Sequence, residues 1–182
     1  MEDLDLEKYC KRIVVGGATN AKTIHPNSVV TAPWVRLKCQ FGCPMYNKGY
    51  CCPPHSMTPD QTRVVIDDYN RAILIHFEIL KEPDKSRKKL IQGYYDMLVE
   101  MEGEMFKDGY YKAFVFLAGH CDRCKECEKI KGTPCKFGDL ARPSMEASGI
   151  DVYQTARNNG FFIKPLRDKT EPWNFYNLML VD

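Results

Sequence analysis

Three cysteines recur at a short fixed interval in the second half of the chain. A fourth follows after seven further residues, and the four are Cys121, Cys124, Cys127 and Cys135. The C-x2-C-x2-C spacing wraps one loop or helical turn around a single point, so that three sulfurs converge on it. A lone metal ion is usually held by C-x2-C pairs from two separate segments, whereas three consecutive thiolates suit three corners of an iron–sulfur cubane. The spacing therefore favours a [4Fe–4S] cluster, and a structural zinc knuckle is the alternative.

A second group of cysteines lies in the stretch 39–55, which is rich in glycine and proline. Its members are Cys39, Cys43, Cys51 and Cys52. The glycine and proline content predicts an ordered loop without regular structure, and a loop of this length inside a compact domain needs something that holds it. A metal centre would do so, and two groups of four cysteines are what two four-iron clusters require. We therefore predict two cysteine-rich metal-binding loops.

The composition is that of a folded chain with little net charge. At 182 residues, with 44% hydrophobic and 12% aromatic residues, it can bury one core, and we predict a single domain over residues 1–182. The formal net charge of +2 implies no general attraction to nucleic acid or to a membrane. No apolar run approaches the ~18 residues of a membrane-spanning helix. The acidic start Met1–Asp5 is unlike a signal peptide and predicts a cytoplasmic protein, in which nine cysteines do not indicate a disulfide framework.

Other polar side chains near the cysteines have ordinary structural interpretations. Cys10 stands alone, and we interpret it as a small buried residue on a terminal helix. His55 and His120 adjoin the cysteine groups and could be ligands or proton donors. Imidazole belongs to zinc sites more than to cubanes, so we favour hydrogen-bonded loop histidines. Arg142 and Glu146 could bind an anion or pair with each other, and we predict the pair.

Positive charge gathers around the second cysteine group. The four lysines there are Lys125, Lys129, Lys131 and Lys136. A cubane with four thiolates carries net negative charge, which these lysines can compensate. They can also form a docking rim for an acidic redox partner protein.

The rest of the chain predicts helices packed on a sheet. Apolar β-rich runs predict strands over 71–79, 112–118 and 175–181. Helical periodicity and start signals predict helices over 3–12, 58–69, 83–107, 142–148 and 151–159. The strand–helix–strand unit from 71 to 118 predicts an α/β (α+β) sandwich with a central mixed sheet and flanking helices. The second of these strands leads the chain directly into Cys121.

Several short motifs together resemble one family. They are Cys43-Pro-x-Tyr, Cys52-Pro-Pro, Gly119-x-Cys-x2-Cys-x2-Cys with Pro134-Cys135, Ala141-Arg-Pro-Ser-Met-Glu-Ala147 and Gly149-Ile-Asp-Val152. The combination is similar to the prokaryotic cysteine-rich family described as predicted metal-binding proteins of unknown function, and it extends from about residue 30 to residue 181. The resemblance implies a metal or iron–sulfur centre and a source among anaerobic microbes. It implies no particular reaction or substrate.

One cysteine departs from the family pattern. The residue before the Cys-Pro-Pro cysteine is often not a cysteine in this family, so Cys51 is an extra thiol. Adjacent residues in an extended chain point to opposite sides, and we therefore rank Cys39, Cys43 and Cys52 above Cys51 as ligands. Three thiolates would leave an open position, which catalytic metal sites keep. Cys135 is assigned to its own group, because its spacer is long enough to fold back.

The sequence leaves three functions open. The first is a small iron–sulfur protein, with two [4Fe–4S] clusters, that transfers electrons or serves a partner enzyme as a redox accessory. The second is a zinc-stabilised interaction module without redox chemistry. The third is an enzyme with a site-differentiated cluster, so whether the protein is an enzyme is undecided at this point.

Overall fold

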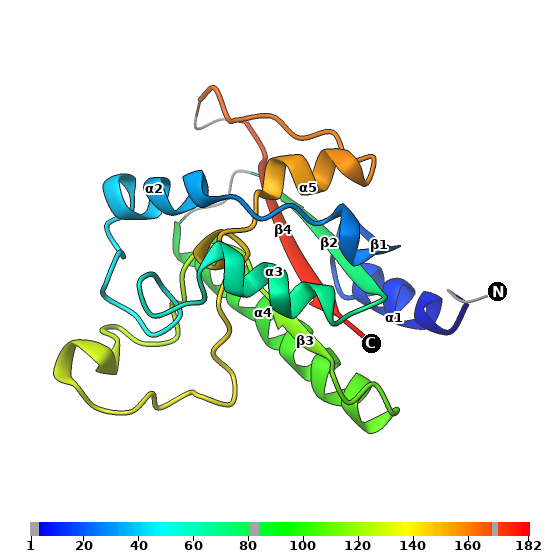
Figure 1. The fold of residues 1–182 in the computed structure, drawn as a ribbon, viewed down its shortest axis with the longest axis horizontal. Coiled ribbons are helices and arrows are strands. Elements are labelled where there is room, and N and C mark those ends of the chain that lie inside the picture. The colour runs from blue at the N-terminus through cyan, green and yellow to red at the C-terminus, as the bar shows by residue number, and fades with distance from the viewer. Residues whose placement is uncertain (1–3, 81–83, 169–170) are drawn as a thin grey trace.

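The computed structural model describes residues 4–80, 84–168 and 171–182. Its centre is a sheet of four strands in the order β1-β2-β4-β3, in which every neighbouring pair runs antiparallel (Figure 1). The strands are β1 (Asn20–Ile24), β2 (Ala72–Ile79), β3 (Phe114–Phe116) and β4 (Trp173–Leu180). β2 and β4 are the long central pair and are matched over all eight residues of each strand.

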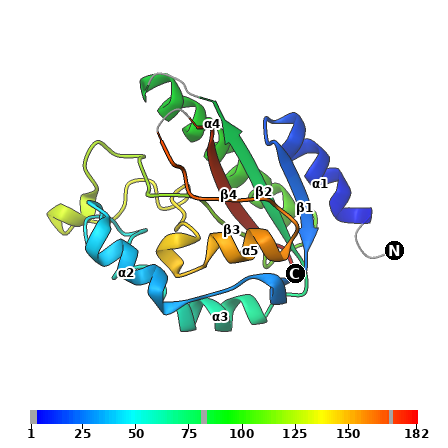
Figure 2. The same cartoon turned by 90° about the horizontal axis from the view of Figure 1, so that it is seen from above.

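Helices cover both faces of this sheet, which gives the α+β sandwich predicted from the sequence (Figure 2). α1 (Leu4–Val15) and α4 (Asp84–Lys107) pack on one face. α3 (Pro59–Asp67) and α5 (Val152–Asn158) pack on the other face. Within the described part of the chain, no helix is long and apolar enough to cross a membrane.

The alternation of strand side chains divides the buried residues into two cores. Ile73 and Phe77 of β2 and Met179 of β4 belong to the core beneath α1 and α4. Leu74 and Leu178, on the opposite faces of the same strands, belong to the core beneath α3 and α5. Burying one such side chain contributes about 1.5–3 kcal/mol, so the two cores hold the sheet between its helices.

The predicted strand–helix–strand unit is present as β2, α4 and β3, but the sheet is antiparallel where the sequence predicted a mixed one. β2 and β3 both run antiparallel to β4, and they are therefore parallel to each other. β4, the last strand of the chain, lies between them and takes the hydrogen bonds that a parallel pair would have made. The result is a split β-α-β unit, whose strand order depends on the whole chain rather than on the local pattern.

The first cysteine group begins on a helix, α2 (Pro33–Gly42), and not in a loop. The prediction of an irregular loop over 39–55 is therefore wrong for its first four residues. Pro33 begins the helix at a position where its missing N–H costs nothing. The Cys43 N–H donates to the Cys39 carbonyl oxygen over 3.3 Å and closes the last turn. This spacing of four residues at a helix end brings both cysteines to one side.

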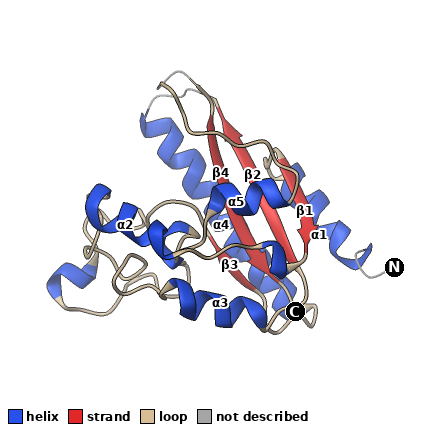
Figure 3. Ribbon diagram, turned by 45° about the horizontal axis from the view of Figure 1, so that its top comes forward, coloured by secondary structure: helices blue, strands red, loops and turns tan. Residues whose placement is uncertain are grey.

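The cysteine-bearing segments gather at one end of the sandwich. In Figures 1 and 3, α2 and the chain that follows it lie beside the long connection that leaves β3. The Tyr50 hydroxyl donates to the Thr133 carbonyl oxygen over 2.8 Å, and Lys129 Nζ donates to the Asn47 carbonyl oxygen over 2.6 Å. The two cysteine segments, which are far apart in sequence, are thus joined directly to each other.

Gly149 makes the tightest glycine contact with a neighbouring element at this end of the fold. Its φ of +78° is in the left-handed region, and a Cβ there would lie 2.4 Å from Pro59 Cγ at the start of α3. We expect Gly149→Ala to lower the free energy of unfolding by about 2 kcal/mol or more, because the conformation costs an L residue about 1–2 kcal/mol and the added Cβ overpacks the contact. Urea denaturation measures this change.

The matched control is Gly103→Ala inside α4, where an added Cβ meets no atom within 4 Å. That variant should be as stable as the parent or gain about 1 kcal/mol, because alanine is the better helix former. A Gly149→Ala protein that is also unchanged in stability would contradict the turn conformation and the close approach of α3.

Candidate metal centre

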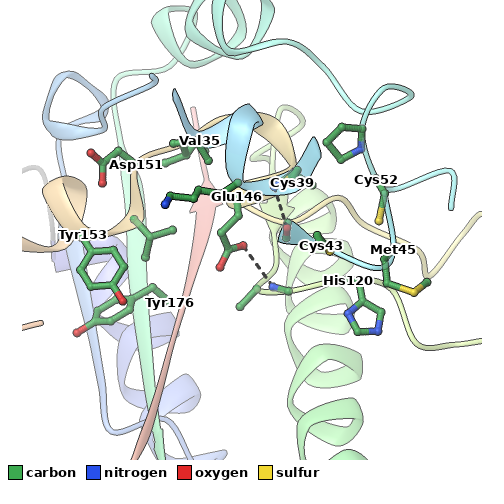
Figure 4. Close-up of a pocket in the computed structure, with 18 of the residues that line it drawn as sticks. Val35, Cys39, Cys43, Met45, Cys52, His120, Glu146, Asp151, Tyr153 and Tyr176 are labelled. Carbon is green, nitrogen blue, oxygen red and sulfur yellow. Dashed lines mark hydrogen bonds between the residues drawn. The ribbon is translucent and has the colours of Figure 1, made fainter. Parts of the chain in front are cut away.

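Three cysteines of the first group line one cavity. Cys39 and Cys43 at the end of α2, together with Cys52, face a cavity of about 420 Å³ (Figure 4). Cys52 is buried, with 6% of its surface exposed. Burial, together with the nearby Cys43 and Cys39 sulfurs, raises the pKa of the Cys52 thiol to about 11. A bound metal cation would lower the pKa of the Cys52 thiol, because metal binding stabilises the thiolate.

A second cavity, of about 270 Å³, adjoins the first and is richer in sulfur. The cysteines that line it are Cys51, Cys52, Cys121, Cys124, Cys127 and Cys135. Cys52 and Met45 line both cavities, so the two are neighbours and share a wall. The structure therefore places every cysteine that the sequence singled out as a ligand on one of two adjoining cavities.

Cys51 faces the second cavity and not the first. Its thiol is hydrogen-bonded to Cys121, which lowers the pKa of the Cys121 thiol and raises the pKa of the Cys51 thiol. The grouping by sequence put Cys51 with Cys39, Cys43 and Cys52. In space, three cysteines line the first cavity and five line the second cavity alone, and Cys52 is the member of the first set that also reaches the second cavity. We call these the three-cysteine site and the five-cysteine site.

The long helix α4 anchors the segment that carries the cysteines of the five-cysteine site. Arg123, within the cysteine run, donates to Asp96 of α4 over 2.7 Å and to the Leu140 carbonyl oxygen over 3.0 Å. Only 9% of the Arg123 side chain is exposed, whereas 45% of the Asp96 side chain is, so the guanidinium lies inside the protein and the carboxylate remains in contact with water. Arg123 ties the start of the cysteine run and the segment after Cys135 to the same helix.

Three of the four lysines at this site form ion pairs or hydrogen bonds within the protein. Lys131 and Lys136 pair with Glu128 over 3.5 Å and 2.9 Å, and Lys129 donates to the Asn47 side chain over 2.9 Å. Glu128 also accepts from the Thr133 hydroxyl over 2.8 Å, and these contacts hold the pKa of its carboxyl near 2. These lysines therefore stabilise the loop that separates Cys127 from Cys135.

The two histidines next to the cysteine groups are hydrogen-bonded loop residues, as predicted. His120 Nε2 lies 2.8 Å from an Asp122 carboxylate oxygen, and the ring lines the first cavity. His55 Nε2 lies 3.4 Å from the Asn47 side-chain oxygen. Cys10, on α1, is partly buried against the first core, also as predicted.

The predicted Arg142–Glu146 pair is wrong. Arg142 binds Glu102 of α4 instead, through two hydrogen bonds of 2.7 Å and 3.0 Å. The prediction required a helix from residue 142, but the structure has only a short 3₁₀ turn, Glu146–Ser148. The two side chains therefore do not share one helical face.

Glu146 instead points into the first cavity, and sequence reasoning did not single it out as a site residue. Figure 4 shows its carboxyl group between the cysteines at one end of the cavity and Tyr153 and Tyr176 at the other. The Gly119 N–H donates to one carboxylate oxygen over 3.3 Å. Burial raises the pKa of the Glu146 carboxyl, despite hydrogen bonds that oppose the shift.

The donor set fits a thiophilic metal. Eight cysteines line the two cavities, and thiolate ligands select zinc, copper(I) and iron–sulfur clusters over hard cations. Over residues 4–80, 84–168 and 171–182, no group of three or more His, Cys, Asp or Glu side chains is arranged to hold a metal ion. The structure thus brings the cysteines to common cavities, and which of them are ligands stays a prediction.

Comparison with known proteins agrees with this donor chemistry. Residues 22–181 match the family described as Predicted metal-binding protein (DUF2284). The chain belongs to this family. Neither a search of curated proteins nor a search of solved structures found a match. Metal binding is therefore the activity predicted for the family, whose description leaves the metal open.

Proposed function

We propose that the chain binds two iron–sulfur clusters, each of the [4Fe–4S] type, and uses them in electron transfer as a redox accessory to a partner enzyme. The observation that carries the proposal is the pair of adjoining cavities lined by eight cysteines. Cys121, Cys124 and Cys127 would hold the cluster of the five-cysteine site, with Cys51 or Cys135 as the fourth ligand. Cys39, Cys43 and Cys52 would hold the other cluster.

The size of the five-cysteine site supports a cluster over a single zinc ion. A structural zinc ion takes four ligands, which close the site, whereas six thiols line the cavity of about 270 Å³ here, one of them, that of Cys52, shared with the first cavity. One water molecule takes about 30 Å³ of the liquid, so this cavity has room for a cofactor of several atoms. The C-x2-C-x2-C run supports the same choice, because it offers three thiolates from one short segment.

The chain itself provides what an electron carrier needs. When bound, clusters of this type supply one-electron chemistry at a potential set by charge, hydrogen bonds and solvent exposure. The peptide bond between Cys51 and Cys52 connects the two sites through a single covalent link. Ile130 and Phe137 are exposed apolar side chains on the rim of the second cavity, and with the exposed Lys125 they form a contact surface for an acidic redox partner protein.

A second candidate function rests on Cys51. Because Cys51 faces the other cavity, only three cysteines line the large one. Three thiolates leave one position of a four-iron cluster without a cysteine, and a position of that kind can bind a substrate. An enzyme with a site-differentiated cluster at Cys39, Cys43 and Cys52 is therefore the alternative, with the 420 Å³ cavity as its binding pocket.

Anaerobic purification followed by iron, sulfide and zinc analysis tests the proposal. We expect about eight irons and about eight sulfides per chain, which is two four-iron clusters. Stoichiometric zinc without sulfide would contradict both candidates and favour the zinc-stabilised module. About four irons and four sulfides would limit the proposal to one of the two sites, and the site that retains iron is then identified with the cysteine variants described in the Discussion.

A further inference from the structure

We propose that the 420 Å³ cavity beside the three-cysteine site binds a small organic cation, with the Glu146 carboxylate as its counter-charge and aromatic side chains as its walls. This inference deepens the proposed function, because it names the class of ligand for the cavity that adjoins one metal site. It differs from metal binding itself, because Tyr153 and Tyr176 lie at the end of the cavity away from the cysteines and Glu146 lies between the two ends (Figure 4).

The cavity has the size and the walls of a small-molecule site. Sites for small ligands have volumes of about 300–1,000 Å³ and are mostly apolar, with a few polar groups that fix orientation. The aromatic residues that line this one are Trp34, Tyr46, Tyr153, Phe175 and Tyr176. They come from α2, the turn after it, α5 and β4, so they surround the space from several elements. Aromatic faces attract cations through the ring quadrupole.

Glu146 supplies a charge that the protein does not balance. Among residues 4–80, 84–168 and 171–182, no lysine, arginine or histidine forms an ion pair with Glu146. Its hydrogen-bonding partners are neutral groups, which are the Ser144 side chain, its own backbone and the Gly119 N–H at 3.3 Å. Glu146 is partly buried, and a carboxylate removed from water costs free energy unless it is paired. Its carboxyl group faces the cavity (Figure 4). A ligand with a positive charge would provide the missing partner.

The other charged groups on the cavity also favour a cation over an anion. Asp151 lines it and adds a second carboxylate, which accepts from the Gln154 N–H over 2.9 Å. His120 Nε2 lies 2.8 Å from an Asp122 carboxylate oxygen. Lys38 is the one lysine of the lining, and it is an exposed residue. The two carboxyl groups of the lining, Glu146 and Asp151, therefore outnumber its one lysine.

A buried hydroxyl lies at the same aromatic end. Tyr176 is 2% exposed, and within the described part of the chain its hydroxyl has no hydrogen-bond partner. Buried polar groups are normally paired, and the hydroxyl oxygen can accept a hydrogen bond from an ammonium group. Its ring stacks on His76 at 4.6 Å, so the side chain is held in place. The aromatic end of the cavity therefore offers an acceptor as well as ring faces.

Tetramethylammonium chloride is the test probe, and tert-butanol is its neutral counterpart of similar shape. Trp34 lines the cavity, so its fluorescence in a Trp173→Phe background reports binding to protein purified with its metal in place. We expect tetramethylammonium to bind at least about tenfold more tightly than tert-butanol, since cation–π and charge contributions act only on the cation. Glu146→Gln should weaken cation binding about tenfold or more, because it removes the buried counter-charge.

The control variant is Glu100→Gln, which changes an exposed glutamate of α4 away from the cavity and should leave binding unchanged. If Glu146→Gln does not fold, Tyr153→Leu removes one aromatic wall and should weaken cation binding several-fold. Equal binding of tert-butanol, tighter binding of acetate, or full affinity in a folded Glu146→Gln protein would overturn the inference. Iron and sulfide are measured on the same samples, so cation binding by a zinc protein would overturn the cluster proposal alone, and a cluster protein that ignores the cation would overturn this inference alone.

Discussion

Cys52→Ser is expected to lose about half of the iron of the anaerobically purified protein, which is the content of one four-iron cluster. Cys52 is the buried member of the three-cysteine site, and only Cys39 and Cys43 would remain there. Cys51→Ser is expected to keep nearly all of the iron, because Cys121, Cys124, Cys127 and Cys135 still offer four thiolates at the five-cysteine site. Iron and sulfide analysis with electron paramagnetic resonance measures both variants.

Cys10→Ser is the matched control, because Cys10 lies on α1 and lines neither cavity. It should keep full iron and an unchanged spectrum. The decisive comparison is between the two adjacent cysteines. If Cys51→Ser empties the three-cysteine site as completely as Cys52→Ser does, both thiols serve that site, and the division into three and five cysteines is wrong. The enzyme alternative would then lose its open position.

The regular elements were the part of the fold that could be predicted from local patterns. The apolar run of β2 and the helical period of α4 extend over enough residues that local preference and burial agree. α3 was also predictable, since Thr58 and Gln61 form a capping box and Pro59 occupies the first turn. The predicted start of the long helix at residue 83 lies outside the described residues, which begin again at Asp84.

Features that depend on distant segments were not predictable in this way. β1 (Asn20–Ile24) has no alternating apolar pattern, and it is a strand because it pairs with the edge of β2. α2 was missed because the glycines and prolines of the stretch 39–55 outweighed the helix start at Pro33. Strand order, which makes the sheet antiparallel, is likewise a property of the whole chain.

The candidate site also has features that could be predicted from the sequence and features that depend on the fold. Spacing alone identified the cysteines that line the two cavities, because their chemistry is carried by residue type. From the sequence we could expect only that the Cys51 side chain points away from that of Cys52. Its contact with Cys121 could not be predicted without the fold. The sequence indicated Glu146 only as a partner of Arg142, because the place of a single glutamate on a cavity depends on the elements that surround it.

Glu102→Ala is expected to produce the largest loss of stability outside the cysteines, about 3–5 kcal/mol in the free energy of unfolding. Glu102 accepts two hydrogen bonds from Arg142 and a third from the Val115 N–H over 2.8 Å. Only 13% of the Glu102 side chain and 14% of the Arg142 side chain are exposed. Removing the carboxylate therefore leaves a shielded guanidinium and a strand N–H without their acceptor. Urea denaturation of the purified variants measures the loss.

Glu104→Ala is a closely matched control, because it removes an ion pair with Arg12 from the same helix two residues further on. That pair is exposed, with 53% of the Arg12 side chain and 44% of the Glu104 side chain accessible to solvent, and exposed pairs contribute little. Since Glu102 connects α4 to β3 and to the segment that follows Cys135, its loss should also loosen the five-cysteine site and lower its iron content. Equal and small effects of the two substitutions would show that the Glu102–Arg142 pair does not hold these elements together.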